Sequence, residues 1–85
     1  MITVASTISL YEQVDNRNES LIITHMPMVK RVAIHLKARV PPFMELDELI
    51  QVGMVGLIEA ARSFDPTKGF EFEHFALSRV RGAIL

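Results

Sequence analysis

The sequence contains no cysteine and no tryptophan, and it has only four glycines and four prolines among its 85 residues. Without cysteine the chain has no disulfide, no zinc knuckle and no thiol nucleophile, so we expect a protein of the reducing cytoplasm. Few glycines and prolines, together with 49% hydrophobic residues, exclude a disordered or collagen-like chain. The chain also lacks a basic leader and any apolar run near ~18 residues, so we expect no signal peptide and no membrane span.

A chain of this length is expected to form one small domain. A second lobe or a deep catalytic cleft is not expected, because folding at this size buries only about 60% of the unfolded chain's surface. The histidines at positions 25, 35 and 74 lack the spacing of metal ligands and have no paired carboxylate beside them. We therefore predict that the protein is not an enzyme and that it uses no metal and no cofactor.

The formal net charge is only −1, but its sign changes along the chain. Residues 1–40 carry five basic and three acidic groups, residues 41–75 carry two basic and seven acidic groups, and residues 76–85 carry two arginines. A nucleic-acid binder that relied on bulk electrostatics would be far more basic. Any DNA contact is therefore expected to be local, and a basic protein partner could face the acidic middle.

The spacing of apolar residues predicts an all-α domain with helices over about 21–40, 47–63 and 71–85. Residues 1–17 show weak patterning and are expected to be a loose N-terminal arm, followed by the helical domain at 18–85. No stop signal follows the third helix, so we expect this domain to be incomplete at its C-terminal end.

Capping and turn residues predict the helix ends. Asn18 and Ser20 are candidate N-caps of the first helix, and Asp47 is the candidate N-cap of the second. Pro27 predicts a kink, or a short helix followed by a fresh start, because proline has no backbone N–H to donate. The DPTKG segment at 65–69 is composed of turn-forming residues.

The second predicted helix carries apolar residues on two faces. Opposite its core face lie Val52, Val55 and Ile58, among charged residues. Either the arm or a neighbouring helix covers this strip, or a partner docks across it.

Gly53 and Gly56 of the same predicted helix each cost about 1 kcal/mol relative to alanine inside a helix. Because they lie on nearly one side, we expect another helix to approach closely there.

The third predicted helix also carries two stripes. Besides an aliphatic core stripe, Phe72, Phe75 and Arg79 recur at helical spacing, with Arg81 nearby. Aromatic rings beside guanidinium groups suit stacking on an unpaired base next to a phosphate. Both phenylalanines could instead be ordinary core anchors, and for Phe72 the pattern favours that interpretation.

Several motifs, in order and at the right spacing, resemble one known family. They are the run LDELIQVGMVGLIEAA at 46–61 and, within 64–84, the segments FDP, KGFEF, FA and RVRGAI. These residues resemble the second conserved region of bacterial sigma factors. The segments VKR at 29–31 and HLKARVP at 35–41, with the RGAI ending, look most like the flagellar or motility sigma factor. The resemblance covers roughly residues 20–85.

The resemblance implies a small three-helix, sigma-2-like fold and sigma factor activity. In this family the exposed face of the second helix binds a coiled coil in the clamp of the largest subunit of core RNA polymerase. The corresponding polymerase-binding positions are Glu48, Gln51, Val52, Met54, Val55 and Ile58. An anti-sigma factor is a further expected partner, and no membrane is expected.

The third helix corresponds to the part of the family that captures the non-template strand of promoter DNA as the −10 element opens. Phe75 stands where the family usually has a tyrosine that stacks on a flipped adenine, and Phe72, Arg79 and Arg81 are expected along the same path. Primary sigma factors have a Trp-Trp wedge where this chain has Ser78-Arg79, as expected for the motility class.

Two alternatives belong to other classes of protein. A helical protein-interaction adaptor without a role in transcription would use the same Val52, Val55 and Ile58 strip, but its phenylalanines would be core residues and Arg79 would have no partner. A helix-turn-helix duplex binder would be expected to carry more basic and amide groups than residues 72–85 offer.

Overall fold

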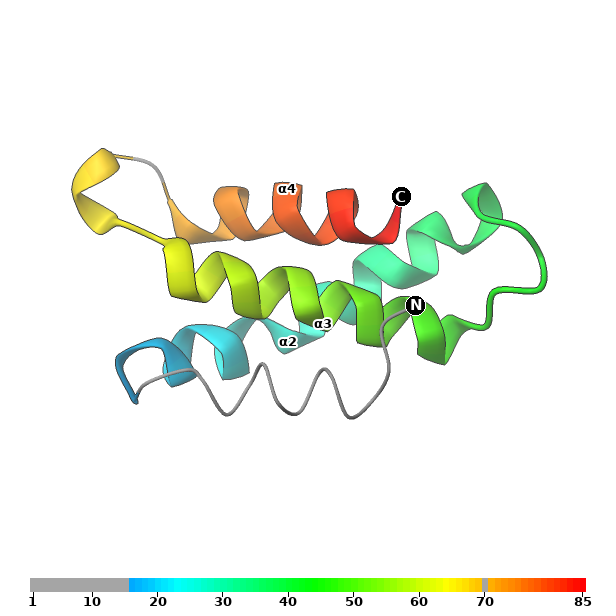
Figure 1. The fold of residues 1–85 in the computed structure, drawn as a ribbon, viewed down its shortest axis with the longest axis horizontal. Coiled ribbons are helices and arrows are strands. Elements are labelled where there is room, and N and C mark those ends of the chain that lie inside the picture. The colour runs from blue at the N-terminus through cyan, green and yellow to red at the C-terminus, as the bar shows by residue number, and fades with distance from the viewer. Residues whose placement is uncertain (1–15, 70) are drawn as a thin grey trace.

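The structure, a computed structural model, describes residues 16–69 and 71–85. Three α-helices and two short 3-10 helices make up the regular structure of these residues, which contain no strand. In chain order they are α2 (Asn16–Leu36), η1 (Lys37–Arg39), α3 (Leu46–Ser63), η2 (Pro66–Lys68) and α4 (Phe72–Ile84) (Figure 1). The predicted all-α fold is confirmed.

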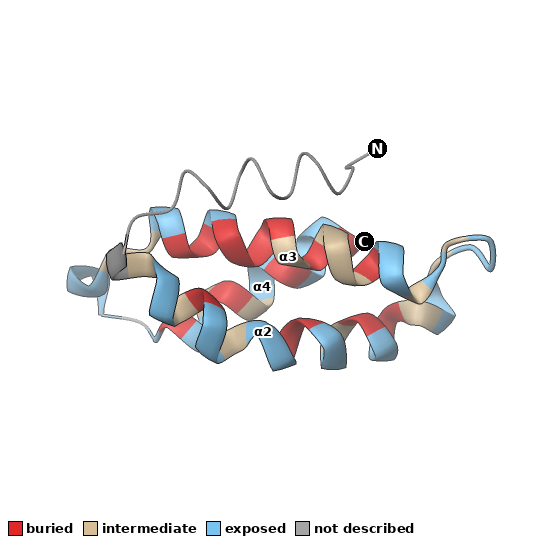
Figure 2. Cartoon of the chain, turned by 90° about the horizontal axis from the view of Figure 1, so that it is seen from below, coloured by how far each residue is buried: buried red, intermediate tan, exposed pale blue. Residues whose placement is uncertain are grey.

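The three α-helices pack around one hydrophobic core. α3 packs extensively against both α2 and α4, whereas α2 and α4 touch each other along a shorter stretch. Buried residues occur in all three helices and are most numerous in α3 (Figure 2). The side chains with no or almost no exposed surface that are largest by volume are Ile22, Val29, Leu49, Leu57, Ile58 and Val80.

α2 begins earlier, and runs further without interruption, than the sequence predicted. It begins at Asn16, so Asn18 and Ser20 lie inside the helix and their prediction as N-caps is wrong. The helix passes through Pro27 without a fresh start. Both Pro27 and Ile23 are exposed, so water can hydrate the carbonyl that the missing N–H leaves without a partner. Residues 1–15 of the predicted arm lie outside the described residues.

α3 begins at Leu46, and its N-cap residue is Glu45, without a side-chain capping bond. The prediction of Asp47 as the N-cap is therefore wrong. Asp47 instead lies in the first turn with Glu48, where negative charge interacts favourably with the positive end of the helix dipole. α3 ends at Ser63, as predicted.

The DPTKG turn reverses the chain between α3 and α4. Asp65 Oδ1 accepts hydrogen bonds from the Thr67 hydroxyl at 2.6 Å and from the Thr67 backbone N–H at 2.9 Å. These bonds stabilise the carboxylate, the hydroxyl most strongly, and so lower the pKa of Asp65 below its ordinary value. Gly69 ends the turn at a φ of 83°, a conformation that glycine adopts without strain.

The predicted close approach at the two α3 glycines is confirmed. A Cβ atom on Gly56 would lie 2.8 Å from the backbone oxygen of Arg79 in α4. A Cβ atom on Gly53 would lie 2.8 Å from a Val29 methyl group and 3.2 Å from a methyl group of Ile84. The glycines therefore set how closely α4 lies against α3, and α4 carries the candidate DNA-binding side chains.

Candidate functional site

The α3 positions expected to bind polymerase differ in exposure. Glu48 is exposed, whereas Gln51, Val52 and Met54 are half-buried. Val52 and Met54 pack against the edge of the hydrophobic core. These four side chains lie on the first half of α3 and offer a partner a carboxylate, an amide and partly accessible apolar atoms.

Val55 and Ile58 do not form an exposed apolar strip. Val55 is 8% exposed and Ile58 is 0% exposed, so of the two alternatives that the sequence left open, cover of the strip within the chain holds at both positions. Ile58 belongs to the cluster of buried residues that forms the hydrophobic core, whereas Val55 is buried outside that cluster. Residues 55–58 are all buried, and four consecutive residues span a full turn of about 3.6 residues, so α3 is covered on every side there.

Phe72 is a core residue and not an open stacking platform. It is only 7% exposed. Its ring meets the Phe64 ring edge-on at 5.1 Å between centroids, and the His25 ring in the same way at 4.9 Å. His25 is oriented by donating from Nδ1 to the Leu21 carbonyl oxygen at 2.8 Å. The low exposure of Phe72 therefore supports its interpretation as a core residue and does not support a contact with DNA.

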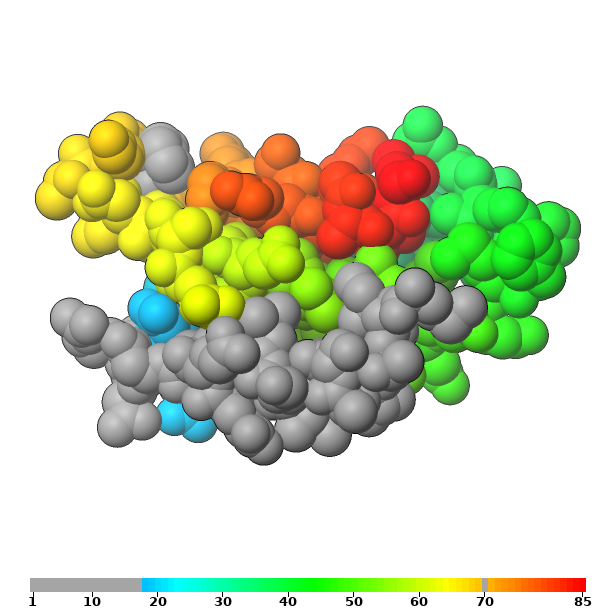
Figure 3. All heavy atoms as spheres, viewed as in Figure 1, coloured from blue at the N-terminus to red at the C-terminus, as the bar shows by residue number. Residues whose placement is uncertain are grey.

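Phe75 and Arg79 form a pair on the accessible side of α4. Phe75 is half-buried and Arg79 is exposed, and the guanidinium carbon lies 5.3 Å from the centroid of the Phe75 ring. This geometry is that of a cation–π contact. Phe64 supports the same ring, with 6.0 Å between the two centroids. The space-filling view shows α4, orange to red, beside the yellow-green α3 (Figure 3).

Arg79 also lines a shallow hollow of about 390 Å³ between α3 and α4. The other lining residues are Glu59, Arg62 and Ser63, all from the second half of α3. Ser63 Oγ donates to the Glu59 carbonyl oxygen at 2.9 Å, which closes the last turn of α3. Two guanidinium groups beside an aromatic ring are suited to a phosphate next to a stacked base.

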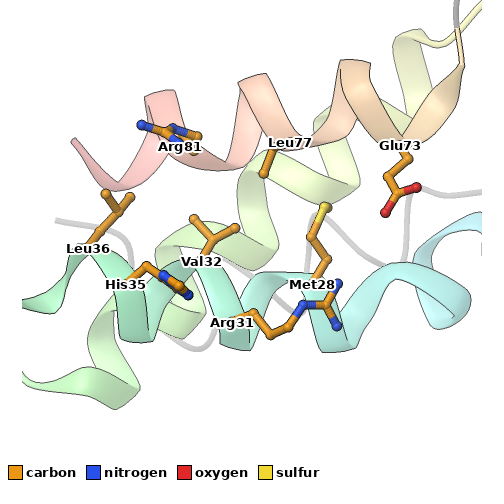
Figure 4. Close-up of a pocket in the computed structure, with 8 residues that line it drawn as sticks. All are labelled: Met28, Arg31, Val32, His35, Leu36, Glu73, Leu77 and Arg81. Carbon is orange, nitrogen blue, oxygen red and sulfur yellow. The ribbon is translucent and has the colours of Figure 1, made fainter.

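Arg81 lies on a different side of α4. It lies two positions after Arg79, which corresponds to about 200° around a helix. It lines the space between α2 and α4, together with His35, Leu36 and Leu77 (Figure 4). The structure therefore places Arg79 and Arg81 at different hollows, and a DNA path that passes both side chains stays a prediction.

Residues 16–69 and 71–85 contain neither a metal-binding cluster nor a helix that could span a membrane. No group of three or more His, Cys, Asp or Glu side chains is arranged to hold a metal ion there. None of the helices in this part of the chain is both long and apolar enough to cross a membrane.

Comparison with known proteins identifies the family. The family model of Sigma-70 region 2 matches residues 21–85, and thus all of α3 and α4 and most of α2. The chain belongs to the sigma-70 region 2 family. This membership, the three-helix fold and the order of the motifs agree with one another.

This sigma-70 region 2 chain is similar to flagellar-type relatives. RNA polymerase sigma factor FliA of Pseudomonas aeruginosa is 44% identical over 86 residues, which cover 99% of this chain and 35% of the relative. FliA of Escherichia coli K12 is 39% identical over 66 residues, covering 78% of this chain and 28% of the relative. The RNA polymerase sigma-D factor of Bacillus subtilis is 33% identical over 67 residues, covering 79% and 26%.

The chain thus spans only about a third of the length of these curated relatives, or less. No solved structure matches this sigma-70 region 2 chain.

Two residues that sequence reasoning missed are close to the candidate site. Phe64 contacts both Phe72 and Phe75, and Arg62 joins Arg79 at the hollow between the helices. Both residues come from the end of α3 or just after it. Periodicity within the third helix could not indicate them, because the contacts cross from one element to another.

Proposed function

We propose that the chain acts as the second region of a flagellar-type sigma factor, in the cytoplasm and without catalytic activity of its own. It binds core RNA polymerase through α3 and contributes α4 to recognition and melting of the −10 promoter element. The membership of residues 21–85 in the sigma-70 region 2 family carries this proposal. The similarity to FliA and sigma-D factors supports its assignment to the transcription of flagellar or motility genes, with an anti-sigma factor as regulator.

The polymerase contact is centred on the first half of α3. Glu48 is exposed, and Gln51, Val52 and Met54 keep part of their surface accessible, so these side chains meet the clamp coiled coil directly. Ile58 contributes indirectly, because its side chain packs in the hydrophobic core and so holds α3 in place, and Val55 has little surface left for a direct contact. A basic partner surface suits this region, since the Glu48 carboxylate is exposed in its first turn.

The DNA contact is centred on the Phe75–Arg79 pair. The Phe75 ring offers a stacking surface, and the guanidinium above it offers a phosphate contact or a further plane for the stack. Arg62 supplies a second positive group across the hollow. Phe64, Phe75 and Arg79 already contact one another in that order. A base extruded from the duplex would add a further layer to this stack.

The polymerase proposal is tested by charge reversal at two neighbouring acids. We expect Glu48→Arg to weaken binding to core RNA polymerase, or to its isolated clamp coiled coil, by about tenfold. The reason is that an attraction between opposite charges across the interface becomes a repulsion. Asp47→Arg is the matched control, because it reverses an equally exposed acid in the same helical turn but lies outside the predicted contact.

Equal loss of binding in both variants would indicate only a general electrostatic attraction. Failure of the folded wild-type chain to bind would contradict the polymerase proposal. Circular dichroism of each variant establishes that α3 is retained.

A further inference from the structure

A groove runs between α2 and α4 on the side of the molecule away from the Phe75–Arg79 pair. Its volume is about 340 Å³, and side chains of α2 and α4 line it (Figure 4). The floor is aliphatic: Met28, Val32 and Leu36 come from successive turns of α2, and Leu77 comes from α4. Met28 and Leu36 are almost fully buried, whereas Val32 and Leu77 keep accessible surface facing the groove.

The rim of this α2–α4 groove is charged. Arg31 and His35 project from α2, and Glu73 and Arg81 project from α4 (Figure 4). All four side chains are exposed, and within the described part of the chain none of them takes part in an ion pair. An aliphatic floor bordered by charged side chains without ion-pair partners is typical of a protein-binding surface.

We propose that the α2–α4 groove binds an acidic amphipathic helix of a partner protein. The floor residues recur along α2 at positions i, i+4 and i+8, which spans about 12 Å of helix axis. A bound helix can therefore place about two turns in the groove. Its apolar stripe would pack on Val32 and Leu77, and its flanking side chains would meet the rim, as in helix-in-groove recognition.

Charge complementarity fixes the chemistry of the partner. Between Glu19 and Glu45 the chain has no acidic residue, and on this stretch Arg31 lines the groove. Arg81 adds a positive charge from the facing helix. Because Glu73 is the only acidic group among the described residues that line the groove, carboxylates that flank the partner's apolar stripe are attracted to the two arginines.

Nucleic acid is the less suitable occupant of this groove. No phenylalanine or tyrosine lines it, whereas unpaired bases are bound mainly by stacking on aromatic rings. The Glu73 carboxylate would also repel a phosphate. The groove proposal does not depend on polymerase binding by α3, because the two surfaces share no residue.

The experiment uses the whole chain and a short synthetic helical peptide with leucine at i, i+3, i+4 and i+7 and glutamate at the flanking positions. A second peptide carries lysine in place of each glutamate. Affinity is measured by fluorescence anisotropy, and the position of binding is measured from NMR shifts of the methyl groups of Val32, Leu36 and Leu77. We expect the acidic peptide to bind, to shift these methyl groups, and to bind more tightly than the lysine peptide.

Charge reversal in the groove supplies the decisive comparison. Arg31→Glu should weaken the acidic peptide about tenfold and strengthen the lysine peptide, as expected when a close charge pair is reversed. Lys30→Glu is the matched control, because it makes the same change on an exposed neighbour that does not line the groove. Arg81→Glu makes the same charge reversal on α4, the facing helix, and should have the same effect. It replaces Arg31→Glu in the comparison if that variant does not fold.

Three results would each overturn the proposal. The lysine peptide could bind the wild-type chain as tightly as the acidic one, or Lys30→Glu could weaken binding as much as Arg31→Glu. Alternatively, a single-stranded oligonucleotide could shift the groove methyl groups while the acidic peptide does not, which would make the groove a nucleic-acid surface.

Discussion

Phe72 and Phe75 are three residues apart in sequence, but their surroundings differ. The Phe72 ring packs between His25 of α2 and Phe64, so it forms part of the core. Phe75 has Phe64 on one side and the Arg79 guanidinium over its ring, and it stays partly accessible. The difference arises from which neighbour each ring meets, and it leaves the Phe75 ring half-buried where the Phe72 ring is buried.

Substitution of Phe75 tests this difference directly. We expect Phe75→Leu to weaken binding of a mixed-sequence single-stranded DNA oligonucleotide by about tenfold, because stacking on an aromatic ring is worth about 1–3 kcal/mol per base. Phe75→Tyr should retain binding, since it keeps the ring. Fluorescence anisotropy at fixed salt is the measurement.

Phe43 provides the control for that series. It is 79% exposed and lies in the loop before α3, away from the candidate site. Phe43→Leu makes the same chemical change and should leave DNA binding at the wild-type level. Wild-type affinity in Phe75→Leu would contradict a stacking role for Phe75.

At the scale of elements, the position of α4 depends on the glycine surface of α3. Gly56 meets backbone atoms of α4, namely the Arg79 oxygen and the Val80 Cα, which cannot move without the helix itself. Gly53 meets the methyl ends of side chains, which can shift more easily. Gly56 is therefore the stricter of the two contacts, and it lies directly beneath the residue that pairs with Phe75.

We expect Gly56→Ala to lower the free energy of unfolding by about 1–3 kcal/mol, because the cost of forcing the helices apart exceeds the gain in helix propensity. Gly53→Ala should cost less. Chemical denaturation monitored by circular dichroism measures both values.

Gly82 is the matched control within α4. A Cβ atom there would meet nothing within 4 Å, so Gly82→Ala should raise stability by about 0.5–1 kcal/mol through helix propensity alone. A stabilised Gly56→Ala variant would show that α3 and α4 are not held by this contact.

At the scale of the whole molecule, the three helices depend on one core. α3 packs on both other helices, so the loss of its central side chain affects every interface. Leu57 is 0% exposed at the middle of α3. A domain of this size has a total stability of about 4–13 kcal/mol.

We expect Leu57→Ala to cost about 3–5 kcal/mol, a large share of that stability, through lost burial and the cavity left behind. The melting temperature should fall by more than about 12 °C, with a single transition seen by both circular dichroism and NMR methyl signals. Leu85→Ala, at a position that is 60% exposed, should change stability by at most about 0.5 kcal/mol. Two separate transitions in Leu57→Ala would contradict a single cooperative unit.

The sequence is sufficient to predict the three helices, the end of α3 at Ser63, the turn at 65–69 and the close approach at Gly53 and Gly56. These features follow from local chemistry: apolar spacing, turn residues, and the lack of a side chain on glycine. The motif order also determined the family, which residues 21–85 match.

Which apolar faces of the helices stay exposed depends on tertiary packing. A helical projection places Val55 and Ile58 opposite the core face, but it carries no information about how many neighbours surround a helix, and α3 is buried on every side at that point. For the same reason the sequence grouped Arg79 with Arg81, whereas the fold turns one toward α3 and the other toward α2. Periodicity gives the direction of a side chain within its own helix, and only packing shows what that side chain meets.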